Sequence, residues 1–169
     1  MSSMTDVLLP DQMIQHGSMQ FSTNVPTFKI KRPGKRPLIF DGIELAVAMS
    51  FTPSLPYWYE INLYRTNDQR FVVSVRLFFQ SENEQDQVRA WDFDTLDQAL
   101  EKLAHYDAAQ DVKFTMDPAT PSLPPAELAA MAMDLRARVE SARRHYASLV
   151  GEFFYELDTV KVPVPRGRA

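Results

Sequence analysis

The chain has 169 residues, 45% of them hydrophobic and 24% charged, which is enough to bury one substantial core. It contains no cysteine, so disulfide bonds and thiolate metal ligands are excluded. No apolar run approaches the roughly 18–20 residues that a membrane span needs, and the first residues lack the pattern of a signal peptide. We therefore expect a cytoplasmic protein that makes no contact with a membrane.

Residues 1–25 are rich in Met, Ser, Gln and Thr, and we expect a flexible N-terminal arm that can dock on a partner. Residues 26–117 are expected to form an α+β sheet domain. Its first strand begins near Thr27, and the prolines and glycine of residues 32–37 predict a turn. Asp41-Gly42 predicts a type I′ hairpin turn, which needs positive φ at both central residues.

The next strand is expected to have two unlike faces, because successive side chains point to opposite sides of a sheet. Its large apolar residues are Ile43, Leu45, Val47, Met49 and Phe51, and the residues of the other face are Glu44, Ala46, Ala48 and Ser50. The small side chains of the second face would let another element pack closely against it.

Residues 57–80 alternate between two faces with period two, which predicts a β-hairpin. Cross-strand partners must share a face, and this requirement favours a three-residue loop over residues 67–69. The resulting register pairs Ile61 with Val75 and Leu63 with Val73 inside, and Glu60 with Arg76 and Trp58 with Phe78 outside. The outer surface then carries Trp58, Tyr64 and Phe78 and is unusually apolar.

The rest of the domain reads as a strand, a short helix and a last strand. Val88–Phe93 has the composition of a strand, and Thr95 with Gln98 forms a capping box at the start of a helix that ends near Asp107. Val112–Met116 predicts a short final strand. The prolines that follow predict a linker over residues 118–125.

Residues 126–158 are predicted to form one long amphipathic helix, and residues 159–169 a basic tail. Apolar residues recur at spacings of four and three, the heptad pattern of helices that pair with a partner. Such a helix would be about 48 Å long at ~1.5 Å per residue, so part of it should project or pair. The predicted oligomer contacts are Leu135, Val139, Tyr146, Leu149 and Phe153, and Gly151 could break the helix.

No motif predicts catalysis, a cofactor or a metal. The acidic run Glu82–Asp86 spaces carboxylates as a calcium loop does, but Gln87 and Phe93 stand where glycine and glutamate are needed. The three histidines have no zinc-site spacing, and the five glycines are too dispersed for a phosphate-binding loop. Enzyme is therefore the least supported class of protein.

Charge is segregated along the chain, although the net value is only −4. Between Thr27 and Phe40 there are bases and no acids, and the possible phosphate contacts are Lys29, Lys31, Arg32, Lys35 and Arg36. A basic loop beside aromatic platforms is typical of proteins that bind single-stranded nucleic acid. The competing interpretation is that the aromatic residues are buried by the helix or by another subunit.

The expected fold is a bent antiparallel sheet of about five or six strands, with a short helix after it and the long C-terminal helix. The favoured function is a non-enzymatic assembly or adaptor protein that forms a homodimer through this helix. It would bind an unidentified protein partner through the sheet face (Trp58, Tyr64, Phe78) or the N-terminal arm. The alternative is a regulator that binds single-stranded nucleic acid through the basic loop.

Overall fold

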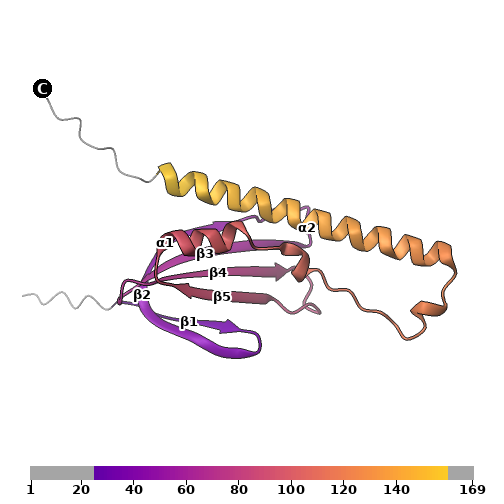
Figure 1. The fold of residues 1–169 in the computed structure, drawn as a ribbon, viewed down its shortest axis with the longest axis horizontal. Helices are drawn as coiled ribbons and strands as arrows, with labels where there is room; N and C mark the ends of the chain where they lie inside the picture. The colour runs from indigo at the N-terminus through magenta and orange to yellow at the C-terminus, as the bar shows by residue number, and fades with distance from the viewer. Residues whose placement is uncertain (1–24, 160–169) are drawn as a thin grey trace, which may run out of the picture.

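The structure is a computed structural model that describes residues 25–159, so the predicted arm and basic tail lie outside this range except at their inner ends. The strands are β1 (Thr27–Arg32), β2 (Lys35–Met49), β3 (Tyr57–Thr66), β4 (Phe71–Phe79) and β5 (Gln87–Phe93). The helices are α1 (Leu96–Ala104), the short 3₁₀ helices η1 (Ala108–Asp111) and η2 (Thr120–Ser122), and α2 (Pro125–Thr159). The five strands are antiparallel neighbours in chain order, and the sheet with its helices confirms the α+β class (Figure 1).

The β3–β4 hairpin has the predicted register. Ile61 pairs with Val75, and Trp58 pairs with Phe78, as the alternation of the two strands requires. Four residues separate the strands, and the backbone N–H of Thr66 donates to the carbonyl oxygen of Arg70 at 2.9 Å, which closes a three-residue loop over residues 67–69. The last residue of this loop, Gln69, has a φ of 66°. A left-handed residue at the end of a three-residue loop is common in hairpins, because it returns the chain to the ladder.

Strand β2 bends sharply at Asp41 and Gly42, where the sequence predicts a turn. Its first half pairs with β1 and its second half with β3, so the β1–β2 hairpin folds away from the rest of the sheet (Figure 1). The predicted type I′ turn is wrong, because neither residue has a positive φ. Gly42 is needed for a different reason: a Cβ there would lie 2.3 Å from the carbonyl oxygen of Arg65. Glycine thus lets β2 bend against the backbone of β3.

The sheet carries a core on each face. On the inner face, side chains of β3 and β4 pack against both helices, with α1 over β4 and β5 and α2 over β2 and β3. On the outer face, the β1–β2 hairpin folds back so that Ile30 joins Tyr64, Val72 and Ala90 in a second cluster. Because both faces of β3 and β4 are covered over part of their length, most of their side chains are buried.

The helices follow the sequence signals closely. Thr95 caps α1, its Oγ1 accepting a hydrogen bond from the backbone N–H of Gln98. α2 continues without a break through Gly151, and the half that begins at Pro125 extends past the ends of the strands (Figure 1). The predicted strand Val112–Met116 is wrong: these residues form no strand, and the carbonyl oxygen of Lys113 accepts from Arg138 on α2 instead.

Candidate functional site: surfaces, grooves and a buried network

The five predicted oligomer contacts on α2 fall into two groups. Tyr146, Leu149 and Phe153 are buried, and they pack on the inner face of the chain's own sheet. Leu135 and Val139 are half-buried. The heptad stripe therefore serves an intramolecular core over its C-terminal half. Among these five residues, only Leu135 and Val139 leave apolar surface for another chain.

The largest exposed apolar row lies on the second half of β2. We call it the β2 stripe, and it consists of Leu45, Val47, Met49 and Phe51, which are 42%, 48%, 52% and 51% exposed. The predicted alternation is wrong at Ile43 and Glu44, because the bulge between Glu44 and Ala46 shifts the register by one residue. Ile43 pairs with Arg65 on the face of Ala46 and Ala48, and Glu44 pairs with Tyr64 on the face of Val47 and Met49. The opposite side of the strand carries Ala46 and Ala48, which pack against the inner core beneath α2. The close approach expected at these small residues is therefore present. The large residues face solvent as a consequence.

The β2 stripe adjoins a strand edge without a partner. Between Gly42 and Met49, β2 pairs with β3 on one side, while β1 pairs with β2 only up to Asp41. The Gly42 N–H still donates to the carbonyl oxygen of Pro26 at 3.1 Å. Beyond it, the backbone groups on the other side of this segment lack a ladder partner within the described residues. A long apolar edge of this kind is a template for pairing with another strand.

The three predicted aromatic contacts of the sheet face occupy different places. Trp58 stacks on Phe78 with ring centroids 5.4 Å apart, and Phe51 meets Trp58 edge-on at 5.3 Å. Both Trp58 and Phe78 keep part of their surface exposed. Tyr64 is buried beneath the β1–β2 hairpin against Phe28 and Phe40, and burial raises its pKa to about 12. Tyr64 therefore offers no surface to a partner.

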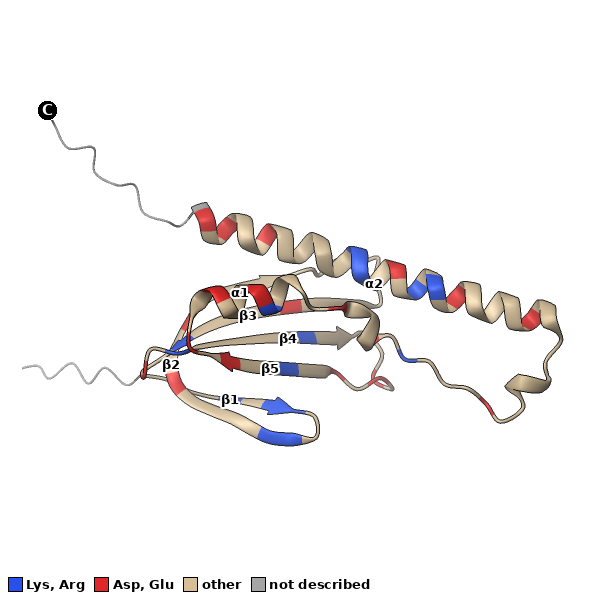
Figure 2. Cartoon of the chain, in the orientation of Figure 1, with Lys and Arg blue, Asp and Glu red and all other residues tan. Residues whose placement is uncertain are grey.

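The basic residues of the β1–β2 hairpin line one wall of a groove of about 670 Å³. Lys31, Arg32 and Lys35 come from the hairpin tip, which carries a cluster of basic residues (Figure 2). Arg89 and Lys113 belong to the other side of this groove, on β5 and after η1. The predicted contacts Lys29 and Arg36 are exposed on the hairpin and do not line it. Sequence spacing gave no sign that Arg89 and Lys113 join this cluster.

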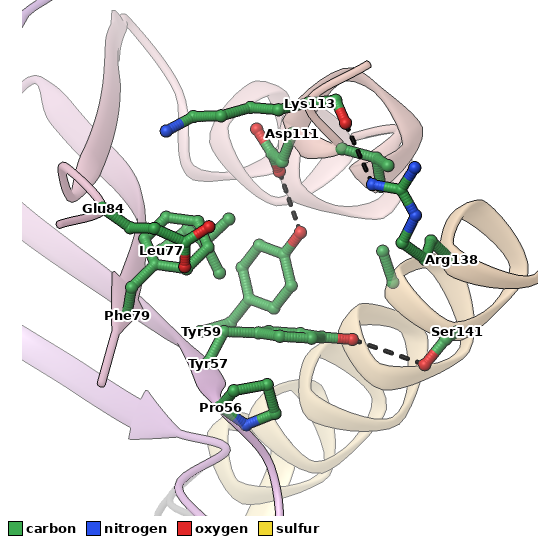
Figure 3. Close-up of a pocket in the computed structure, with 12 residues that line it drawn as sticks. Pro56, Tyr57, Tyr59, Leu77, Phe79, Glu84, Asp111, Lys113, Arg138 and Ser141 are labelled. Atoms are coloured by element: carbon green, nitrogen blue, oxygen red, sulfur yellow. Dashed lines mark hydrogen bonds between the residues drawn. The ribbon is translucent and has the colours of Figure 1, made fainter. Parts of the chain in front are cut away.

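A second pocket, of about 310 Å³, opens between the strands β3 and β4 and the helix α2 (Figure 3). Tyr57 and Arg138 line its sides, and Tyr59 points across it to Asp111 (Figure 3). The carboxylate of Asp111 accepts from the Tyr59 hydroxyl at 2.9 Å, from the Tyr106 hydroxyl at 2.7 Å and from Arg89 Nε at 3.2 Å.

The Asp111 network is a structural anchor. Burial and the adjacent Asp111 carboxylate raise the pKa values of Tyr59 and Tyr106 far above the ordinary 10.0, so both hydroxyls stay protonated as donors. Both oxygens of Asp111 are occupied by donors from the chain itself. The sequence showed none of this, because Arg89, Tyr106 and Asp111 come from separate elements with no shared motif.

A second unpredicted contact joins β2 to α2. The Nε2 of His145 lies 2.6 Å from the Oγ of Ser50, and that oxygen also accepts the backbone N–H of Tyr59 at 2.9 Å. A serine beside a histidine is the start of a nucleophilic site in hydrolases. Here the serine oxygen already closes the end of the β2–β3 ladder. The pair therefore positions α2 on the sheet.

Comparisons with protein-family models, with curated proteins and with solved structures gave no significant match. Within residues 25–159, no three His, Asp or Glu side chains gather as ligands of a metal ion would. No helix in this part of the chain is long and apolar enough to cross a membrane.

Proposed function

We propose that the protein is a non-enzymatic assembly protein, and that it associates with a second copy of itself through the β2 stripe and the free edge beside it. The observation that carries this proposal is the β2 stripe, a row of four large apolar side chains, each 42–52% exposed. Leaving so much contiguous apolar surface in water is unfavourable by roughly 25 cal/mol per Å². Patches of this kind mark interaction sites.

The second half of β2 lacks the devices that usually protect an edge strand. Natural sheets block exposed edges with Lys, Pro, very short strands or a covering loop. Residues 42–51 contain no Lys and no Pro, and their single charged residue is Glu44. The bulge between Glu44 and Ala46 interrupts the ladder once, and several residues of regular strand remain beyond it. The edge is therefore suited to pairing.

A second copy of the chain is the partner that this edge fits. Two identical β2 edges that pair antiparallel around a two-fold axis would place apolar stripe against apolar stripe. Glu44 would stand opposite an uncharged residue in every such register except the one centred on itself, so like charges need not meet. The result would be one continuous sheet of ten strands across the dimer, twice the five of each chain.

The helix α2 contributes to the same assembly in a secondary role. It lies over β2 and β3, beside the free edge, so a copy paired at β2 comes close to the solvent side of α2. Leu135 and Val139 on α2 have half-exposed apolar surface. These two of the five predicted oligomer contacts therefore remain accessible to a second copy.

Sedimentation equilibrium of the full chain and of Val47→Lys tests the proposal. The wild type should sediment at twice its 19.4 kDa at micromolar concentration. A lysine at the centre of the stripe removes about 1.5–3 kcal/mol of apolar burial per copy, so the dissociation constant should rise at least about tenfold.

Ile39→Lys is the matched control, because Ile39 is 60% exposed on the half of β2 that pairs with β1. This variant should dimerise as the wild type does. A wild type that stays monomeric over the whole concentration range, or equal loss of dimer in both variants, would contradict the proposal.

A further inference from the structure

The basic groove, defined as the cavity between the tip of the β1–β2 hairpin and β5, gathers cations from three parts of the chain. Lys31, Arg32 and Lys35 come from the hairpin, Arg89 from β5 and Lys113 from the segment after η1. The hairpin reaches this position because β2 bends at Gly42 and folds back beneath the sheet (Figure 1). The groove is therefore built by tertiary folding and is absent from any single sequence segment.

The positive charge of the groove is largely uncompensated. Its lining includes two acids, Asp86 and Asp111. Asp111 is already bound by Tyr59, Tyr106 and Arg89, and Asp86 accepts a hydrogen bond from the backbone N–H of Phe79. Among the ion pairs of residues 25–159, none includes a basic residue of the hairpin. The hairpin cations are thus available to an external anion.

Two of the groove cations are held in place before any ligand arrives. The Nε of Arg32 donates a 3.0 Å hydrogen bond to the carbonyl oxygen of Arg36, across the hairpin turn. Arg89 is held by Asp111 at 3.2 Å. Holding a guanidinium in place reduces the entropy that would be lost on binding, and its remaining N–H groups suit the oxygens of a phosphate.

An aromatic platform lies at the same end of the sheet as the groove, on its outer face. The groove runs along β5, where Arg89 pairs with Val75 of the inner face. Trp58 and Phe78 face each other across β3 and β4, stacked at 5.4 Å. The neighbouring outer-face pair on β4 and β5 is Arg76 with Val88, and Val88 lines the groove. The platform therefore adjoins the outer-face side of the groove, at Val88.

From this arrangement we propose that the basic groove binds the phosphate backbone of a single-stranded nucleic acid whose bases stack on Trp58 and Phe78. A positive track beside aromatic side chains is the combination that sequence-tolerant single-strand binders use, and each stacked base is worth ~1–3 kcal/mol. An acidic peptide would bind the cations, but it has no bases to stack on the aromatic platform. The groove and the platform come from one chain, so binding does not require a second copy.

The test is fluorescence anisotropy of a labelled oligothymidine, titrated with the full chain at several salt concentrations. Affinity should fall with salt, because each phosphate contact releases bound counterions and contributes about 0.7 to the logarithmic slope. The double variant Lys31→Gln/Lys35→Gln should therefore lower that slope by about 1.4 and weaken binding at low salt. Both lysines are exposed, so the variant should keep the wild-type melting temperature.

The matched control is Arg136→Gln/Arg144→Gln, which removes two exposed charges from α2 and none from the groove. It should keep the wild-type slope. Trp58→Leu should weaken binding about tenfold without changing the slope, because it removes stacking and no charge.

Each contrary result removes the proposal. Absence of salt-dependent binding would overturn it, as would equal loss in the two charge variants. A duplex or inorganic polyphosphate that competes as well as the single strand would show that phosphate density alone is recognised and would also overturn it. The monomeric variant Val47→Lys should bind as the wild type does, which separates this site from the proposed assembly.

Discussion

The hydroxyl of Tyr59 on β3 donates a 2.9 Å hydrogen bond to Oδ2 of Asp111, 52 residues further along the chain at the end of η1. This bond joins the centre of the sheet to the segment that connects α1 with α2. Tyr106 and Arg89 complete the coordination of the same carboxylate. The carboxylate thus fixes the path of the chain between the two helices, and it separates the pocket from the basic groove, both of which it lines.

Loss of this carboxylate should destabilise the fold strongly. Asp111→Ala leaves two buried hydroxyls and the guanidinium of Arg89 without their acceptor, so we expect the free energy of unfolding to fall by about 3–5 kcal/mol. Asp134→Ala is the control, since it removes an exposed helical ion pair worth less than about 1 kcal/mol. Urea denaturation followed by circular dichroism measures both changes. Equal free energies of unfolding for the two variants would show that the Asp111 network does not stabilise the fold.

Two glycines should respond to alanine in opposite directions. Gly42→Ala places a Cβ 2.3 Å from the carbonyl oxygen of Arg65, so β2 or β3 must move and stability should fall. Gly151→Ala meets nothing within 4 Å in the middle of α2, and it should raise the free energy of unfolding by about 0.5–1 kcal/mol. Thermal melting of the two variants tests this. A tolerated alanine at position 42 would contradict the account of the β2 bend.

The buried tyrosines make the fold sensitive to alkaline pH. Burial raises the pKa of Tyr64 to about 12, and burial also raises the pKa values of Tyr59, Tyr106 and Tyr146 far above 10.0. Because the fold favours the protonated phenols, their contribution to stability is complete below pH 10 and is lost as pH rises through the folded-state pKa values.

Phenolate absorbance between pH 10 and 12 should therefore be smaller for the folded chain than for the chain in urea. The remaining absorbance should appear together with unfolding. Full phenolate absorbance near pH 10 with an unchanged circular dichroism spectrum would contradict the prediction that the buried tyrosines stay protonated in the folded chain.

The C-terminal half of α2 should belong to the stability of the monomer. Phe153 is 1% exposed and Tyr155 is 73% exposed, although they lie only two residues apart on the same helix. Phe153→Ala should cost about 3–5 kcal/mol through the cavity it leaves, whereas Tyr155→Ala should change stability by less than about 0.5 kcal/mol. Denaturation at low protein concentration, where dimers are absent, measures both. A small effect at Phe153 would mean that α2 is not docked on its own sheet.

Patterns local in sequence predicted much of this fold. The alternation of residues 57–80 was sufficient for the β3–β4 register, because a one-residue slip would turn every apolar side chain to the wrong face. The heptad spacing of α2 predicted a continuous helix, but it did not identify the surface against which the helix packs. Apolar spacing identifies the buried stripe of a helix, but it does not indicate whether the same chain or another chain covers that stripe.

The surfaces could not be predicted in the same way. The two faces of β2 were predicted correctly from Ala46 onward, but the bulge between Glu44 and Ala46 exchanges the faces of Ile43 and Glu44. Which face meets water depends on α2, which packs on Ala46 and Ala48 a hundred residues earlier in the chain. Asp41-Gly42 has the sequence of a tight hairpin turn. In the structure, glycine is required at position 42 because the carbonyl oxygen of Arg65 leaves no room for a side chain. Arg89 and Lys113 join the basic hairpin only after the bend at Gly42 is made.

Hydrogen–deuterium exchange of residues 43–49 at low and high protein concentration tests the central claim most directly. If β2 pairs with a second copy, the amides of its free edge should exchange more slowly at high concentration, and Val47→Lys should abolish this slowing. Peptides from β4, which is paired on both sides within one chain, should be unaffected. Exchange of residues 43–49 that is fast and independent of concentration would contradict the assembly function.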